Sequence, residues 1–338
     1  MIFLLISYFL LLASFTIYSY SQVDLNLTLS GNSFYQLIQQ KLTYLGYFNR
    51  PLSGAIFASI LILFFIYYFI FYRLVVKKKL SLKKIKFLLL ASCFLLLFSY
   101  PAFSHDIFNY IFDTRIAIYH KLSPWTHTAL DFPQDTWIRF MRWTHRTFPY
   151  GPVWLGISSP FYLLGLNKFT LTLLSFKLLG AIGYLSSCYL LYKLTSNSKS
   201  LAIFAFNPLI LISALNGAHL DIIMTALFLW ALYLKKQKIL SWLALIASAL
   251  TKYVTFIFFP FWFLMKRIKR PIFWLIILSL ISAAVQIILR EFNPWYLILP
   301  LAVISLSHRH RLALLLSFLL SLFPLFRYLY FVYTGEYL

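Results

Sequence analysis

A single run of nineteen residues decides the fold of this chain: Gly54–Tyr72, which reads GAIFASILILFFIYYFIFY. It contains no charged residue, and Arg73 follows it directly, with Lys77, Lys78 and Lys79 close behind. A helix needs about 20 apolar residues to cross the core of a bilayer. Lys and Arg at one end of such a run are typical of the cytoplasmic side of a membrane. The run therefore predicts a transmembrane helix that ends in the cytoplasm.

Further apolar runs repeat this pattern along the chain. Phe87–Phe103, Leu171–Leu194 and Ile272–Ile288 approach or reach the length of a span. The 338 residues are 62% hydrophobic and 20% aromatic, which excludes an ordinary soluble domain because apolar usage there is nearer half. The sequence therefore predicts an all-α polytopic membrane protein, with residues 1–338 as a single integral membrane domain.

The formal net charge is +22, yet the basic residues are gathered in a few breaks between apolar runs. Such clusters suit the cytoplasmic face and its anionic lipids, so membrane lipids and not nucleic acid are the expected partners. Both cysteines lie within apolar runs, which gives no sign of a disulfide or a thiolate metal site, and no cofactor is expected. The basic clusters occupy Arg73–Lys86, Lys193–Lys199, Lys235–Lys238, Lys266–Arg270 and Arg309–Arg311.

Placing every basic cluster in the cytoplasm assigns the remaining breaks to the outer side by alternation. This predicts about eleven spans, with the amino terminus inside. Gly151–Leu166 disturbs the alternation: it is short for a span and carries two prolines, so we interpret it as re-entrant or interfacial. The alternative is that it crosses the membrane and Lys193–Lys199 faces outward. Residues 104–170 are expected as an external loop, and the other outer breaks are Ser21–Arg50, Asn216–Asp221, Thr251–Tyr253 and Arg290–Asn293.

The stretch Ser104–Tyr110 (SHDIFNY) opens the external loop and holds the first candidate for chemistry. The chain has only eight acidic residues, and Asp106 comes directly after an apolar run, where an ionisable group is costly and often functional. Asp106 is a candidate general base that accepts a proton from a hydroxyl; the alternative is a helix cap. Asp113 lies two helical turns further on, and Arg115 is a candidate ion-pair partner for it.

A second group of polar residues falls on the same predicted side. His219 and Asp221 follow Asn216 between two apolar runs, where they either cap a helix or bind and orient a phosphate. Lys252, with Tyr253 after it, stands outside the cytoplasmic clusters. A charge that breaks the positive-inside pattern needs a partner, so Lys252 is a candidate ligand for a phosphate, or else it snorkels to the interface.

The external loop interleaves aromatic and basic residues, which suits short helices in the headgroup region and contacts to sugar rings. The chain has no HExxH, CxxC or Walker-type motif and no glycine-rich phosphate loop, so a nucleotide-bound donor is not expected. The site candidates are Trp125, Trp143 and Tyr150 for stacking, Arg142, His145 and Arg146 for anion binding, and His105, Asn109, Tyr110, Asn216, Asp221 and Tyr253 for further substrate contacts.

Several of these elements occur in a familiar order between about residues 100 and 300. Together they resemble polyprenyl-phosphate-sugar-dependent glycosyltransferases of the GT-C superfamily, and in particular the bacterial alpha-mannosyltransferase-like branch. The elements are Ser104–Tyr110, Lys121–Trp125 (KLSPW), Tyr150–Leu155 (YGPVWL), Asn207–Ile210 (NPLI), Asn216–Asp221 (NGAHLD), Ala249–Tyr253 (ALTKY) and Asn293–Tyr296 (NPWY).

The resemblance implies a GT-C-like helical bundle in a bacterial plasma membrane, with its catalytic loop outside. It implies inverting transfer of a sugar, expected to be mannose, from a polyprenyl-phosphate carrier to a glycan or glycolipid acceptor, without a metal. The base maps to Asp106, with Asp24 as a rival, and the donor phosphate to Lys252, His219 and one of Arg142 or His145. Two other classes stay open: a transporter or flippase of a lipid-linked saccharide, and a glycan ligase or polymerase using a diphosphate-linked donor.

Overall fold

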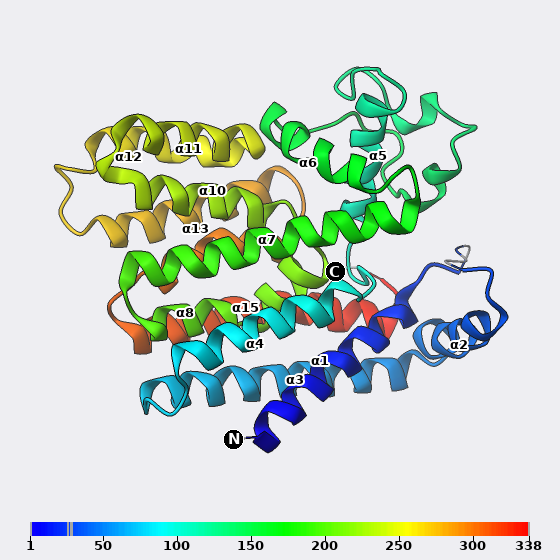
Figure 1. Ribbon diagram of the computed structural model, residues 1–338, viewed down its shortest axis with the longest axis horizontal. Coiled ribbons are helices and arrows are strands. Elements are labelled where there is room, and N and C mark those ends of the chain that lie inside the picture. Colours follow the sequence, from blue (N-terminus) through cyan, green and yellow to red (C-terminus); the bar gives the residue numbers. More distant parts are fainter. Residues whose placement is uncertain (1, 26, 28–29, 337–338) are drawn as a thin grey trace.

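The computed structural model describes residues 2–25, 27 and 30–336, and all regular structure in this part of the chain is helical (Figure 1). Five helices are long and apolar enough to cross a membrane, which confirms the predicted all-α membrane class. The run Gly54–Tyr72 lies wholly within one of them. These helices are α1 (Ile2–Ser19) continued by η1 (Tyr20–Gln22), α3 (Arg50–Val76), α7 (Phe169–Thr195), α13 (Pro271–Leu289) and α15 (His310–Thr334).

A sixth candidate span is broken in the middle. Helix α8 (Ser198–Ala205) and the helical segment Pro208–Asn216, made of α9 (Pro208–Ile210) and η5 (Leu211–Asn216), meet at 54°. The break falls at Asn207, because Pro208 has no N–H to continue the helix. The Asn207 side chain caps the helix that follows and accepts hydrogen bonds from the backbone N–H groups of Leu209 and Ile210. Five or six spans follow from length and composition, so the predicted count of about eleven is not confirmed.

The other apolar runs form shorter helices than the sequence predicts. Phe87–Phe103 is helical only to Leu97, and Pro101 lies in the irregular link that follows. Gly151–Leu166, interpreted above as re-entrant or interfacial, forms a helix of 13 residues with Pro152 at its first position and Pro160 within it. The bounds are α2 (Ser33–Thr43), η2 (Tyr44–Phe48), α4 (Leu82–Leu97), α5 (Asp106–Ile118), η3 (Ala129–Asp131), η4 (Thr136–Phe140), α6 (Pro152–Leu164), α10 (Asp221–Tyr233), η6 (Leu234–Lys236), α11 (Lys238–Thr251), η7 (Tyr253–Phe258), α12 (Phe259–Leu264), η8 (Pro294–Leu297) and α14 (Ile298–Ser305).

The connections divide between the two ends of the helix bundle. Figure 1 shows the turns between α3 and α4, α7 and α8, and α12 and α13 at one end, the left of the view. Each of these turns carries one of the basic clusters. Helices α2, α5 and α6 and the long loop between α5 and α6 lie at the other end. The cavities described below are therefore built at the end opposite these basic turns.

The external loop is held together by a buried arginine. Arg115 of α5 pairs with Asp135 and donates hydrogen bonds to Tyr162 and Asn167, while Tyr119 and Trp137 lie 4.0 and 4.1 Å from its guanidinium. Burial opposes ionisation of the Asp135 carboxyl, but the hydrogen bond from Arg115 holds its pKa below the usual value. The expected pair of Arg115 with Asp113 is therefore wrong, because residues two apart on a helix do not face each other.

A second buried cation joins the bundle to the site. The Lys177 ammonium of α7 donates to the backbone oxygens of Ser99 and Asn216 and to the Ser99 hydroxyl. The Asn216 amide in turn donates to Ser99 and to the carbonyl of Tyr100, at 2.9 and 2.6 Å. These bonds satisfy carbonyls that the ends of α4 and η5 leave open, and they fix the chain that leads to α5 beside the chain that leads to α10.

Candidate active site

A cavity of about 460 Å³ opens where four segments meet. They are the start of α5, the loop before α6, the residue that follows α11, and the link from α13 to η8. Acids, bases and aromatic rings share its wall. The lining residues are Asp106, Asn109, Asp113, Trp143, Arg146, Thr147, Pro149, Tyr150, Lys252, Leu289, Arg290, Glu291, Asn293, Trp295 and Tyr296.

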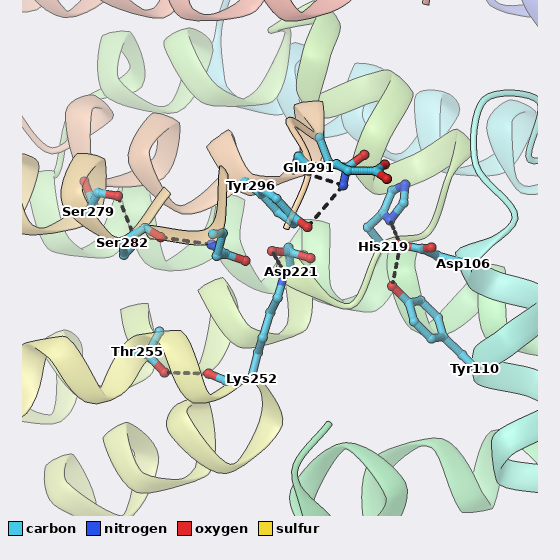
Figure 2. A network of polar contacts seen from close by, with 12 residues as sticks. Asp106, Tyr110, His219, Asp221, Lys252, Thr255, Ser279, Ser282, Glu291 and Tyr296 are labelled. Carbon is cyan, nitrogen blue, oxygen red and sulfur yellow. Dashed lines mark hydrogen bonds and ion pairs between the residues drawn. The ribbon is translucent and has the colours of Figure 1, made fainter. Parts of the chain in front are cut away.

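Asp106 is the first residue of α5, and its carboxylate is held from two sides (Figure 2). The Tyr110 hydroxyl donates to Oδ2 at 3.4 Å, and His219 Nδ1 lies 3.3 Å from the same oxygen. The side chain is 14% exposed, so it reaches the cavity while most of its surface is shielded from water. A carboxylate in the first turn is also favoured by the positive end of the helix dipole. The Asp106 carboxylate thus reaches the cavity from a largely buried position.

His219 lies behind Asp106 and does not line the cavity. The imidazole is buried and stacks on the indole of Trp295, with ring centroids 3.8 Å apart and planes inclined by 13°. A Cβ at Gly217 would lie 2.8 Å from this imidazole, so the glycine leaves room for the ring. His219 therefore packs against Asp106 with Nδ1 3.3 Å from its carboxylate, and no hydrogen bond forms between the two.

Lys252 projects into the same cavity from the break between α11 and η7 (Figure 2). Its ammonium donates to Asp221 Oδ1 at 2.7 Å and lies 4.5 Å from the centre of the Tyr296 ring. Asp221 is buried at the start of α10, and its Oδ2 makes no hydrogen bond within the described residues. Asp221 and Lys252 therefore form an ion pair, and Lys252 is the member of the pair that lines the cavity.

The remaining predicted residues divide by position. Trp143 and Tyr150 line the main cavity, whereas Trp125 donates to the Tyr150 carbonyl from outside it. Asn216 is buried in the Lys177 cluster, and Tyr253 is exposed beside Phe256. His145 lines neither of the two cavities described here, whereas Arg146, three residues from Trp143, lines the main one.

A second cavity of about 190 Å³ adjoins the first and holds two more of the predicted residues, His105 and Arg142. The His105 ring lies 2.9 Å from the Asp24 carboxylate. Burial acts against ionisation of Asp24, but the His105 hydrogen bond and the charge of Arg142 hold its pKa below the usual value. Asp24 lines neither cavity. The wall between the cavities consists of Trp143, Glu291, Asn293 and Trp295, which line both.

Comparison with known proteins identifies a family for this arrangement. Residues 13–267 match the family model described as alpha-(1->6)-mannopyranosyltransferase, N-terminal domain (MptA/B family), which covers well over half of the chain. The chain belongs to this mannosyltransferase family. No curated protein matches the chain, and no solved structure does. The matched region of the mannosyltransferase contains Asp106, His219, Asp221 and Lys252 and ends before Asn293.

Sequence reasoning passed over part of the mannosyltransferase cavity. Asn293, Trp295 and Tyr296 belong to the NPWY element, which carried the resemblance but no assigned role. Arg290 and Glu291 stand in a predicted outer break, and only that placement pointed to them. Within the described part of the chain, no three His, Cys, Asp or Glu side chains gather as a metal site.

Proposed function

We propose that this mannosyltransferase takes mannose from a polyprenyl-phosphate carrier and attaches it to a hydroxyl of a glycan or glycolipid acceptor at the outer face of the membrane. The observation that carries the proposal is the position of Asp106. Its carboxylate lines the main cavity, the Tyr110 hydroxyl donates to it at 3.4 Å, and the His219 ring lies 3.3 Å from it. A base must lie within hydrogen-bond reach of the proton it takes, and the cavity is where a substrate hydroxyl can approach it.

The proposed reaction is a single displacement with inversion. The acceptor oxygen forms a bond to C1 of the mannose while the bond from C1 to the carrier phosphate oxygen breaks. The acceptor proton goes to Asp106, and the bonding electrons leave with the phosphate. The phosphate is already ionised, so it needs charge stabilisation more than protonation. A base on one face of the sugar and cations on the other suit this geometry.

The main cations proposed for the phosphate line the same cavity as Asp106. Lys252 lines it, but Asp221 offsets much of the lysine charge at 2.7 Å. Arg146 and Arg290 add two guanidinium groups, whose planar donors match phosphate oxygens. Arg142 reaches the adjoining cavity and remains a candidate there. His145 lines neither cavity, so the proposal omits it, and His219 is given the role of orienting the base.

Aromatic side chains complete the proposed sugar site. Trp143, Tyr150 and Trp295 line the cavity, and aromatic faces pack well on the apolar faces of sugar rings. The Trp295 indole also stacks on His219, with ring centroids 3.8 Å apart, so one side chain contacts both the proposed sugar site and the histidine behind Asp106. Leu289, at the end of the apolar helix α13, places hydrocarbon surface beside the cavity, where the first units of a polyprenyl chain would lie.

The direct test replaces the proposed base and its rival. Asp106→Asn keeps size and most hydrogen bonding but removes the proton acceptor, so transfer should fall about 100-fold or more. Asp24→Asn, in a carboxylate that lines neither cavity, should retain most activity. The assay measures radiolabelled mannose moved from polyprenyl-phosphate mannose in membranes of a deletion strain expressing each variant at equal abundance. An active Asp106→Asn with an inactive Asp24→Asn would assign the base to Asp24.

The outward orientation has its own test. Cys93 and Cys188 are first replaced by serine, and single cysteines are then introduced as Tyr253→Cys and Lys78→Cys, both at exposed positions. In intact cells an impermeant thiol reagent should label Tyr253→Cys, whereas Lys78→Cys should react only after permeabilisation. Labelling of both from the same side contradicts the proposed topology without touching the assignment of the base.

A further inference from the structure

One face of α5 presents a polar stripe to the main cavity. Asp106, Asn109 and Asp113 are spaced by three and four residues, which places them on one side of the helix, and all three line the cavity. Asp106 begins the stripe and is oriented by its neighbours. The other two residues have no role in the reaction proposed above.

Asn109 and Asp113 each present a polar group to the cavity that lacks a matching partner. Asp113 is 4% exposed, and within the described residues no hydrogen bond or ion pair is found for its carboxyl. The Asn109 amide donates to the Trp143 carbonyl at 3.4 Å, while its Oδ1 is buried without a donor. An unmet buried polar group costs about 1–3 kcal/mol. Two such groups on one cavity wall mark a place where a polar ligand would satisfy them.

The chemistry of the stripe suits a sugar hydroxyl. Burial raises the pKa of the Asp113 carboxyl well above its usual value, which favours the neutral form with its one donor and one acceptor. Asn109 Oδ1 offers a further acceptor. A hydroxyl group also carries one donor and accepting lone pairs. The neutral Asp113 carboxyl and Asn109 Oδ1 can therefore donate to and accept from a sugar hydroxyl without burying a charge.

We propose that Asn109 and Asp113 form the acceptor-sugar subsite, in which Asp113 binds an acceptor hydroxyl other than the one that attacks C1 of the donor. This inference rests on the proposed function, since the acceptor is identified by its contact with Asp106. The rise of an α-helix places Asp113 about 10 Å along the axis from Asp106. Two hydrogen bonds of about 2.8 Å leave roughly 5 Å between them, enough for one pyranose ring. The acceptor ring lies along α5, with its reacting hydroxyl at Asp106.

The test compares two substitutions of one residue. Asp113→Asn preserves shape and keeps one donor and one acceptor, so acceptor kcat/KM should stay within about threefold of the unaltered protein. Asp113→Ala removes both and should lower it by about 10- to 100-fold, chiefly through KM. The matched control is Asp131→Ala, an exposed acid of the same loop that accepts from the Thr128 backbone and lines neither cavity.

The acceptor probes are methyl alpha-mannopyranoside and its 2-, 3- and 4-deoxy analogues, all of which keep the 6-hydroxyl. With the unaltered protein, kcat/KM for one deoxy analogue should be about 10-fold or more below that for the parent probe. With Asp113→Ala the two probes should have equal kcat/KM, because the substitution and the missing hydroxyl remove the same hydrogen bond. Equal KM values for Asp113→Ala and Asp131→Ala overturn the subsite. The subsite is also overturned if Asp113→Asn, at normal abundance, is as defective as Asp113→Ala, since position 113 would then need an ionised carboxylate.

A binding measurement separates this inference from the reaction. Trp143 and Trp295 line the cavity, so tryptophan fluorescence should report binding of the same mannoside without any transfer. Asp113→Ala should weaken that binding and Asp113→Asn should not. An unaltered protein that transfers nothing, yet binds the probe through Asp113, contradicts the proposed function alone. An active protein whose binding ignores Asp113→Ala contradicts the subsite alone.

Discussion

The ion pair between Lys252 and Asp221 makes a prediction that separates structural from substrate roles. Asp221 is almost fully buried, and the ammonium 2.7 Å away is its only charged partner within the described residues. Lys252→Met removes that partner while keeping the length of the side chain. The carboxylate is then left uncompensated, which costs about 3–5 kcal/mol when such a pair is broken from one side. Loss of the contact with the Tyr296 ring adds about 0.5–1 kcal/mol.

A loss of about 3 kcal/mol lowers the folding equilibrium by more than about 100-fold, at about 1.4 kcal/mol per factor of ten. Asp221→Asn should cost less, about 1.5–3 kcal/mol, because the freed ammonium faces the cavity and can be hydrated. The double variant Lys252→Met/Asp221→Asn has no buried charge left and should recover most of the loss. The cycle should therefore give a coupling energy of about 2 kcal/mol or more.

The assay follows tryptophan fluorescence of purified protein as a denaturing detergent is added to mild micelles. Lys193→Met is the matched control: its ammonium lies over the Tyr189 ring at 5.5 Å and forms no ion pair with a described carboxylate, so its effect should stay below about 1 kcal/mol. Donor KM is measured on the same samples. If Lys252→Met is as stable as Lys193→Met, the pair does not stabilise the fold. If the stable double variant keeps the donor KM of the unaltered protein, Lys252 does not bind the carrier phosphate.

Two further perturbations probe how the external loop is attached. Gly151→Ala would force a methyl group into the Leu250 carbonyl at the end of α11, so it should lower the free energy of unfolding by about 1–3 kcal/mol and impair transfer. Gly156→Ala, which has open space around it, should leave stability unchanged or raise it slightly. Equal stabilities of the two variants would refute the contact. Protease resistance of the loop should decline as pH falls from 4 toward the lowered pKa of Asp135. The stability that the ionised carboxylate gives the folded loop is complete above its unfolded value of 3.8 and is lost as pH falls through the lowered folded value. Asp135→Asn should remove this dependence, and an unchanged acid response in that variant would exclude the pair as its source.

The sequence predicts the membrane class and the main chemical candidates because both depend on local pattern. Long uncharged runs such as Gly54–Tyr72 become helices wherever they fall, and basic clusters mark the turns between them. Asp106 and Lys252 stand out because charges at the ends of apolar runs are costly. The structure brings these two residues to one cavity, as their shared predicted side suggested.

The span count and the finer site depend on contacts between distant segments, which composition does not encode. The run Phe87–Phe103 approaches the length of a span, yet its helix ends at Leu97, because buried helices and spans share the same composition. The partner of Arg115 is set by the path of the loop to Asp135, and the stacking of His219 on Trp295 by the approach of η8. No local spacing predicts either contact.

The thin wall between the two cavities has a consequence for how such enzymes diverge. Three of its four residues, Glu291, Asn293 and Trp295, come from one short link after α13, beyond the region that the family model matches. The proposed base and its orienting histidine come from other segments. Trp295 also stacks on that histidine. Relatives that differ in this one link should therefore differ in both cavities at once, and in the packing behind the proposed base.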